Sequence, residues 1–254
     1  TIKELNDIIN DPKTAAYKQL GKIAGVGIAT IDKWWKLGVD SLETLQVFVT
    51  DGKINLNHMQ QLGLKYYNDL NERIPRDEVT AIANDIKAQL IQLDPNVVFE
   101  VAGSYRRQFA TSGDVDILIS NRAHYIDDIL SMFVKLLGKN DKFAGAMSAG
   151  PSRLTFLYRQ TVVRQVDILN IRYPSYYAAL LYFTGDWNFN QAMRGYAKSK
   201  GFRLNQEGLF KYVGKQLKQL ELIPVNSEQE IFDVLQIQYI PPDQRTESKI
   251  IPLL

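Results

Sequence analysis

The sequence contains no cysteine and only two histidines, His58 and His124, which lie far apart in the chain. Disulfide bonds, thiolate zinc sites and cysteine nucleophiles are therefore excluded, and so is a histidine-rich metal site. Any bound metal must be a hard cation held by carboxylates. Long hydrophobic runs are also lacking, since the longest, residues 176–183, is far shorter than the ~18 to 20 apolar residues of a membrane helix.

The overall composition is that of an ordinary globular protein. The 254 residues are 45% hydrophobic and carry a net charge of +2, which excludes a disordered chain and favours one or two compact domains. The charge is unevenly distributed, because residues 141–220 hold 12 Lys and Arg against 4 Asp and Glu. Such a basic region attracts polyanions such as nucleic acid, although a merely solvated basic surface would explain it equally well.

Apolar periodicity and turn residues predict an α+β fold. Residues 16–70 are expected to form short helices separated by glycines, and residues 103–113 a polar loop. The Gly-rich stretch at residues 145–150 lacks the lysine of a phosphate-binding P-loop and is predicted to be a turn. The remaining elements are strands at 97–101, 114–119, 154–158 and 162–169, and helices at 76–93, 124–137, 176–183 and 187–200.

Three acidic residues are candidates for a metal site. Asp114 and Asp116 are two residues apart on a predicted strand, so their side chains point to the same face. Asp167 stands alone in the apolar run of residues 162–169, where a carboxylate is costly unless it is paired or bound to metal. The three would suit a magnesium ion if their strands were neighbours. The alternatives are an exposed strand face for the first pair and a salt bridge from Asp167 to Arg164.

The residues before these acids favour phosphate binding. Gly103 and Ser104 offer backbone N–H groups and a hydroxyl, and Arg107 offers a bidentate donor. Ser112 and Gly113 follow directly before Asp114. Metal-binding acids beside phosphate-binding donors are the requirement for phosphoryl or nucleotidyl transfer.

These strings, Gly-Ser-Tyr-Arg-Arg at 103–107 and Ser-Gly-Asp-Val-Asp at 112–116, resemble the signature of the family X DNA polymerases, the family of DNA polymerase beta. The resemblance covers nearly the whole chain from about residue 16 onward, with several motifs in the family's order. These motifs are residues 62–67, residues 73–76, residues 182–185 followed by Asn190, Met193 and Arg194, and residues 227–232 leading to Tyr239 and Pro241. The resemblance implies a helical DNA-binding subdomain at 1–75, a nucleotidyltransferase palm with a mixed β-sheet at 76–181, and a C-terminal α/β nucleotide-selecting subdomain at 182–254.

The resemblance also implies roles for individual residues. Asp114, Asp116 and Asp167 would be the catalytic acids that bind two Mg²⁺ ions, and Arg194 would reach the template strand. Core packing is the alternative for Tyr182, Phe183 and Trp187. The residues that would hold the dNTP are Arg73, Ser104, Arg107, Ser112, Gly113, Tyr182, Phe183, Gly185, Trp187 and Asn190, with Thr184 in the same turn.

A second motif lies near the start of the chain. Gly25 and Gly27 open a predicted helix, where glycines let the backbone approach a phosphate. The stretch resembles the family's helix-hairpin-helix motif, which binds the DNA backbone. The resemblance implies that the carbonyls of Gly21, Ile23 and Val26 hold a monovalent cation, Na⁺ or K⁺. An ordinary turn between two helices is the alternative.

Some positions depart from the family pattern. Gln165 and Leu169 stand where beta-type enzymes carry arginines, and Trp187 replaces a small or acidic residue. These changes affect the expected balance of open and closed states. Only about 15 residues precede the resemblance, too few for the family's lyase domain. We therefore expect no deoxyribose-phosphate lyase activity from this chain.

The implied function is template-directed DNA synthesis that fills short gaps during repair. Gapped or primed duplex DNA and a dNTP would be the partners of a soluble monomer without membrane contact, nuclear if it is a cellular protein. A template-independent transferase of the same family is a second candidate function, but the turn at residues 159–161 looks too short for its template-blocking loop. A non-catalytic DNA-binding scaffold and a small-molecule nucleotidyltransferase are two further candidates.

Overall fold

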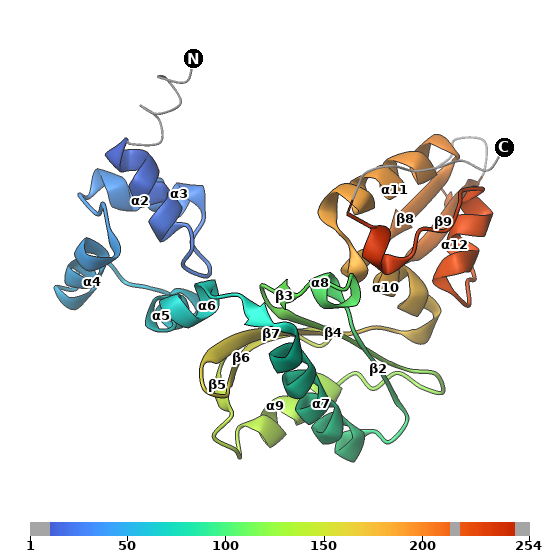
Figure 1. Cartoon of the computed structure of the whole chain (residues 1–254), viewed down its shortest axis with the longest axis horizontal. Helices are drawn as coiled ribbons and strands as arrows, with labels where there is room; N and C mark the ends of the chain where they lie inside the picture. Colours follow the sequence, from blue (N-terminus) through green and yellow to red (C-terminus); the bar gives the residue numbers. More distant parts are fainter. Residues whose placement is uncertain (1–10, 214–218, 247–254) are drawn as a thin grey trace. The chain divides into compact units, whose positions relative to one another are not determined.

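The computed structural model describes residues 11–213 and 219–246 (Figure 1). Contacts within the chain divide it into two compact units, Thr1–Glu72 and Arg73–Leu254. Each unit has its own hydrophobic core. No helix in the described ranges combines the length and the apolar character needed to cross a membrane.

The first unit contains short helices, as the sequence predicts. Ser41 and Asn57 each begin a helix with a capping box, in which side chain and backbone exchange hydrogen bonds and satisfy free N–H groups. The core of this unit includes Leu20, Ile23 and Trp34. The helices are α2 (Pro12–Leu20), α3 (Ile28–Lys36), α4 (Leu42–Thr50), α5 (His58–Lys65) and α6 (Tyr67–Asn71).

The second unit is built on a five-stranded mixed sheet with the order β2-β4-β7-β6-β5. The central pair β4 and β7 is parallel, and the other neighbours are antiparallel. The four strands predicted from the sequence all belong to this sheet, which confirms the α+β fold class. Its strands are β2 (Val97–Val101), β4 (Val115–Asn121), β5 (Phe143–Ala149), β6 (Arg153–Arg159) and β7 (Val163–Asn170).

Helices cover both faces of this sheet (Figure 1). Successive side chains of a strand point to opposite faces, so alternate residues of each strand contact different helices. On one face, α7 (Arg76–Leu93) and α9 (Ile129–Leu137) pack against Ile117 and Ile168. On the other face, α10 (Tyr176–Thr184) packs against Leu118 and Leu169. Residues two positions earlier on these strands point to the same face as Leu118 and Leu169. Asp116 and Asp167 are those residues, so they lie on the α10 side, next to its apolar contact.

The C-terminal part of this unit packs around Phe189 and Phe232, both fully buried. A buried ionic contact connects this part to the sheet region, because Arg106 and Arg245 both donate hydrogen bonds to Glu228. Its elements are α11 (Trp187–Ser199), β8 (Phe202–Asn205), β9 (Gly208–Val213), β10 (Gln219–Ile223) and α12 (Glu228–Leu235). The short elements of the unit are β1 (Ile74–Pro75), α8 (Gly103–Arg106), β3 (Thr111–Ser112), η1 (Tyr173–Ser175) and η2 (Pro242–Gln244).

The helix predicted at 124–137 is wrong in its first part, since α9 begins only at Ile129. The Asn121 side chain accepts hydrogen bonds from the backbone N–H groups of Ala123 and His124. This local contact satisfies the backbone in a turn and competes with helix formation. The segment therefore stays irregular until Asp128, the residue before the helix.

Two more expectations are also wrong. Residues 145–150 do not form a turn, because most of them belong to the edge strand β5, in which Gly145 takes a φ of 142° beside a register shift. Residues 103–113 are not wholly a loop either. They form the single turn of α8 and then β3, which pairs with β1.

Candidate active site

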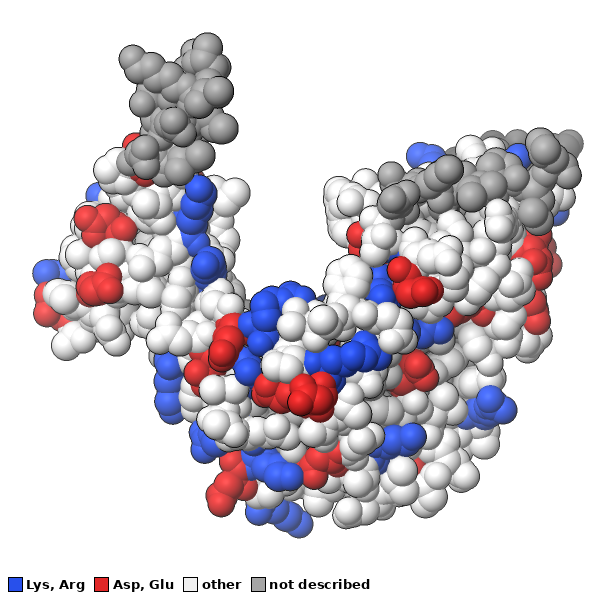
Figure 2. All heavy atoms as spheres, viewed as in Figure 1, with Lys and Arg blue, Asp and Glu red and all other residues white. Residues whose placement is uncertain are grey.

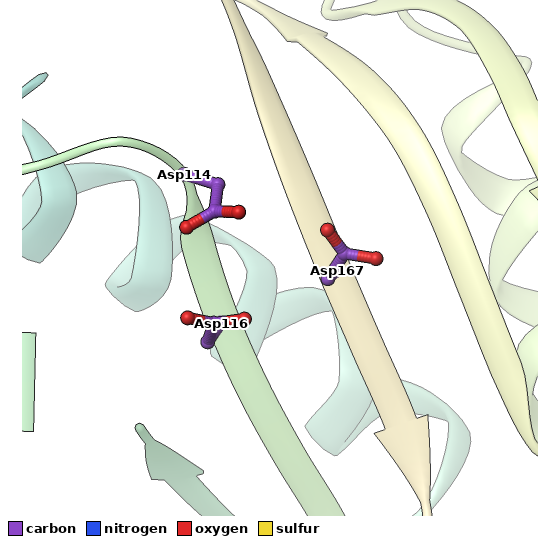
Figure 3. A group of neighbouring side chains, drawn as sticks. All are labelled: Asp114, Asp116 and Asp167. Atoms are coloured by element: carbon purple, nitrogen blue, oxygen red, sulfur yellow. The ribbon is translucent and has the colours of Figure 1, made fainter. Parts of the chain in front are cut away.

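The structure brings the three predicted acids together. Asp116 on β4 stands directly opposite Asp167 on the parallel strand β7, and Asp114 immediately precedes β4 (Figure 3). One carboxylate oxygen from each residue lies within 4.8 Å of those of the other two. The predicted convergence is therefore confirmed, and it follows from one parallel strand pair in a matching register.

The cluster carries more negative charge than its surroundings offset. Burial, and then the neighbouring Asp114 and Asp167 carboxylates, raise the pKa of Asp116 to about 8, against the opposing effect of Arg107 and Arg153. Burial and Asp167 also raise the pKa of Asp114. Crowded carboxylates favour protonation unless a cation lies among them, and three oxygen donors suit a hard divalent ion. The residues present thus fit a divalent metal.

Asp167 has a defined set of donors. Its Oδ1 accepts from Arg153 at 3.0 Å and from the hydroxyl of Thr155 at 2.5 Å, while its Oδ2 accepts from Gln165 at 2.8 Å. The suggested salt bridge to Arg164 is wrong, because the Arg164 guanidinium faces the other side of β7 and pairs with Glu78. The aspartate does pair with an arginine, but with one on the neighbouring strand.

Gly103 must lack a side chain for the cluster to form. Its φ is +56°, and a Cβ placed on it would lie only 2.0 Å from Oδ2 of Asp116. The backbone at the start of α8 therefore touches the acid directly. Ser104 follows in the same turn and donates a hydrogen bond to Ser112 at 2.9 Å. This contact ties the two candidate phosphate-binding segments to each other.

A cavity of about 660 Å³ opens beside the acids. On the face drawn in Figure 2, Lys and Arg side chains gather over α8 and β3, the elements next to this cavity. Asp167 and Ser112 are absent from its lining, and both are almost fully buried. The sequence-predicted residues that line it are Arg73, Ser104, Arg107, Gly113, Asp114, Asp116, Tyr182, Phe183, Gly185, Trp187, Asn190 and Arg194.

The guanidinium groups near the cavity differ in how they are held. Arg107 donates to the carbonyl of Thr184 at 2.6 Å, and its buried Nε has no hydrogen-bond partner in the described structure. Burial lowers the pKa of Arg107. Arg73 is exposed and donates to the hydroxyl and carbonyl of Thr111. An anion in the cavity would offer the unsatisfied Arg107 group an acceptor.

The far wall of the cavity comes from α10 and α11. Asn190 donates to the carbonyl of Tyr182 at 2.7 Å, and the Arg194 guanidinium lies 4.5 Å from the centre of the Tyr182 ring. Trp187 is 70% exposed, so the alternative that it packs in the core is wrong. Tyr182 and Phe183 are half-buried, with their rings edge to face, and line the cavity.

Sequence reasoning missed four cavity residues, Phe109, Arg153, Asp186 and Gln191. Phe109 is 40% exposed, and its ring centre lies 5.0 Å from the Arg107 guanidinium. A large apolar residue inside a polar segment was the available signal for it. Arg153 carried no such signal, because its proximity to Asp167 arises only from the antiparallel pairing of β6 with β7.

The glycine turn in the first unit has the local geometry of a helix start. Gly25 takes a φ of +75°, and Gly27 is the residue before α3, where its side chain-free backbone leaves helix N–H groups accessible. The carbonyl of Ile23 accepts from the N–H of Val26 at 3.1 Å. Gly21, Val26 and Gly27 line a shallow cavity of about 550 Å³ with Lys13 and Lys18.

Comparison with known proteins supports the resemblance to family X DNA polymerases that the sequence motifs indicate. Models of the DNA polymerase beta palm and thumb match residues 73–172 and 179–246, and a model of the DNA polymerase lambda fingers domain matches residues 18–71. DNA polymerase lambda from Rattus norvegicus is 30% identical over 250 residues, which cover 88% of this chain and 41% of the rat protein. The chain thus spans less than half the length of that relative.

Two solved structures of polymerase beta from Leishmania infantum are also similar. One is a ternary gap complex, with a TM-score of 0.85 and 28% identity over 93% of this chain and 91% of the other. The second is a ternary P/T complex, with a TM-score of 0.84 and 30% identity over 92% of this chain and 99% of the other. Three matching domains in the family's order, together with this likeness, show that the chain belongs to the family X DNA polymerases.

Proposed function

We propose that this chain is a DNA-directed DNA polymerase that transfers a nucleotidyl group from a dNTP to a primer 3′-hydroxyl and fills short gaps during repair. The observation that carries the proposal is the convergence of Asp114, Asp116 and Asp167 beside a cavity lined by arginines. The ternary gap complex of the similar polymerase beta supports gapped DNA as the substrate.

The three acids fit two Mg²⁺ ions, which when bound would supply activation of the primer hydroxyl and neutralisation of charge on the departing pyrophosphate. Asp167 is the acid nearest the primer terminus in this proposal. Its orientation is fixed by Thr155 and Gln165, which donate to its two oxygens. Such fixed placement before the reaction lowers the reorganisation that the transfer requires.

Donors around the cavity would bind the triphosphate. Arg107 and Arg73 present guanidinium groups, Ser104 presents a hydroxyl, and Gly113 lets the backbone come close. Ser112 would act from behind the cavity wall, by accepting the hydrogen bond of the Ser104 hydroxyl. Arg107 is suited to this role because its buried Nε still requires an acceptor. An anionic ligand would also offset the desolvation of this guanidinium.

The residues of α10 and α11 would select the nucleotide. Tyr182, Phe183 and Gly185 line the cavity and would pack by the sugar, and Asn190 would read the minor-groove edge of the base. Trp187 is exposed at the cavity and would stack on the new base pair, and Arg194 would contact the template strand. In this division of labour, residues 76–181 carry the chemistry and residues 182–254 the nucleotide selection.

The first unit would bind the DNA backbone without reading sequence. Gly25 and Gly27 support this role, since a glycine turn before a helix leaves N–H groups free to contact a phosphate. Lys13 and Lys18 lie at the same cavity and add positive charge. In this proposal the carbonyls of Gly21, Ile23 and Val26 hold Na⁺ or K⁺ next to the bound phosphate.

The test is primer extension on a one-nucleotide gap with each dNTP in turn, in the presence of Mg²⁺. Wild-type protein should add the complementary nucleotide, and Asp167→Ala should lose at least about a thousandfold in rate while keeping its circular dichroism spectrum and its affinity for gapped DNA. Asp233→Asn, an exposed acid on α12, is the matched control and should extend normally. Extension by Asp167→Ala near the wild-type rate would contradict the proposal.

The same assay separates the competing candidate functions. Three residues, 160–162, connect β6 to β7, which leaves no room there for a loop that replaces the template. Extension of a single-stranded primer without template would nevertheless favour the template-independent transferase. Binding of gapped DNA without any incorporation would favour a non-catalytic scaffold.

A further inference from the structure

Arg153 is the charged partner of the most buried acid in the cluster. Its Nη2 lies 3.0 Å from Oδ1 of Asp167. The two side chains differ greatly in freedom, because that of Asp167 is 4% exposed and that of Arg153 is 59% exposed. The aspartate is held in place from the sheet, whereas the arginine reaches it from the first residue of β6. An ion pair with one solvated member can separate at low cost.

The remaining donors to Asp167 are neutral and better fixed. Thr155 is buried on β6, and Gln165 lies two residues before the aspartate on β7. Together they keep a hydrogen bond on each carboxylate oxygen when Arg153 leaves. Arg153 is therefore not needed to orient the acid. Its contribution is positive charge, delivered to a cluster in which the Asp116 and Asp114 carboxylates already repel that of Asp167.

Arg153 also has a second place to bind an anion. It lines the active-site cavity and a neighbouring cavity of about 520 Å³, which Tyr125 and Arg172 also line. Two arginines beside an open cavity attract a phosphate group. A modest rotation of the long, exposed Arg153 side chain can move its guanidinium from Asp167 to this second cavity.

We propose that Arg153 is an exchangeable counter-cation: it neutralises Asp167 while the cluster is free of metal, and it moves to a DNA backbone phosphate when a divalent ion binds. A divalent ion among the three carboxylates and a guanidinium on Asp167 repel each other, so the two compete for the same charge. The DNA half of this inference rests on the proposed polymerase function, whereas the competition between Arg153 and metal does not.

The exchange makes metal and DNA binding cooperative. In the absence of metal, Arg153 is occupied by Asp167 and contributes little to DNA affinity. When metal is bound, Arg153 is released from Asp167 and adds a contact to a DNA phosphate. By thermodynamic linkage, DNA that captures Arg153 must favour metal binding by the same factor. Arg153 thus controls the positive charge beside Asp167 without contacting the reacting atoms.

The first experiment measures Mn²⁺ binding to the full chain without DNA or nucleotide, by electron paramagnetic resonance of the free ion. Asp116→Asn identifies the signal that belongs to the cluster. Arg153→Met should bind Mn²⁺ about tenfold more tightly than wild type, because a competing charge is gone. Arg153→Lys keeps the charge and should stay within about threefold of wild type. The control Arg172→Gln removes a charge from an exposed arginine paired with Asp127, and should also stay within threefold.

Unchanged or weaker Mn²⁺ binding by Arg153→Met would overturn the proposal, since it would show that the arginine supports the site rather than competing with metal. An equal tightening in Arg172→Gln would also overturn it, because the effect would then be one of general surface charge. Circular dichroism of each variant verifies folding, and the exposed position of Arg153 favours a folded product.

The second experiment measures the affinity of gapped duplex DNA by fluorescence anisotropy, with Mg²⁺ and with chelator at equal ionic strength. Arg153→Met should lose about threefold more affinity in Mg²⁺ than in chelator. A loss of the same size in both conditions overturns the exchange onto DNA. If the chain proves inactive in primer extension while Arg153→Met still tightens Mn²⁺ binding, the polymerase proposal fails and the competition between arginine and metal remains supported.

Discussion

Two clusters of charge lie in the second unit, and they are built in opposite ways. In one, Glu228 receives hydrogen bonds from Arg106 and Arg245, with distances of 2.7 Å to each arginine. Glu100 lies 3.7 Å from Arg106 as well, so two cations there face two anions. In the other, Asp114, Asp116 and Asp167 crowd together with far less compensation. A cluster whose charges balance internally serves the fold, whereas an unbalanced one is stable only with a ligand to supply the missing charge.

This contrast predicts that removing one negative charge has opposite effects on stability at the two places. Glu228→Gln should lower the free energy of unfolding by about 3 to 5 kcal/mol, because Arg245 is completely buried and would lose its counter-charge. Urea unfolding followed by circular dichroism measures the change. Asp233→Asn, on the same helix but exposed, should shift stability by less than about 0.5 kcal/mol.

A loss below about 1 kcal/mol in Glu228→Gln would break the comparison, since the ionic contact would then contribute no more than a surface pair. Glu228 also connects α12 to Arg106 of α8, the turn that carries the candidate phosphate-binding residues. We therefore expect the variant to bind dNTP more weakly as well.

At the acid cluster, Asp116→Asn should instead stabilise the metal-free protein. The pKa of Asp116 is raised to about 8 in the folded state, above its ordinary value near 4 in the unfolded chain. The folded state therefore binds more protons between about pH 4 and pH 8, and stability falls as pH rises through that window. Asp116→Asn has no carboxyl to ionise, so it does not lose stability as the pH rises. It should therefore be more stable than wild type by about 2 kcal/mol at pH 8.

Thermal or urea unfolding in the presence of a chelator tests this, at pH 5 and at pH 8. The advantage of Asp116→Asn should shrink at the lower pH, where the wild-type carboxyl is protonated in the folded state. Equal pH dependence in the two proteins would show that Asp116 is already compensated, and the distinction between the two clusters would disappear.

Sequence patterns predicted the parts of this molecule that depend on neighbours along the chain. The helix at 76–93 and the strand at 97–101 have the predicted limits. The acid cluster was also predictable, because an aspartate in the middle of an apolar strand needs a special partner. Family resemblance then indicated which strands lie side by side.

The parts that depend on pairing between distant segments could not be predicted. Arg106 and Glu228 are 122 residues apart, and neither has a local pattern that requires the other. Arg153 reaches Asp167 only because β6 and β7 pair in one particular register. The edge strand β5 was missed because Gly145 within it and Gly150 directly after it are typical of turns. In each case the deciding contact comes from tertiary structure, which overrides local preference.

The smallest effect concerns the ligand that the unbalanced cluster requires. Divalent ions bind carboxylates only after their protons leave, so the affinity of the cluster for Mn²⁺ should rise with pH as Asp116 ionises. Below the pKa of about 8, the apparent affinity should fall by at most tenfold for each pH unit. Calorimetric titration at pH 7 and pH 8, in buffers of different ionisation enthalpy, measures both the affinity and the protons released. Binding with no proton release would mean that all three carboxylates are charged without metal, as in a cluster whose arginines fully balance it. Binding that releases close to one proton at pH 7 would instead show that the metal supplies the positive charge that the cluster lacks. The metal would then compensate the three aspartates as Arg106 and Arg245 compensate Glu228.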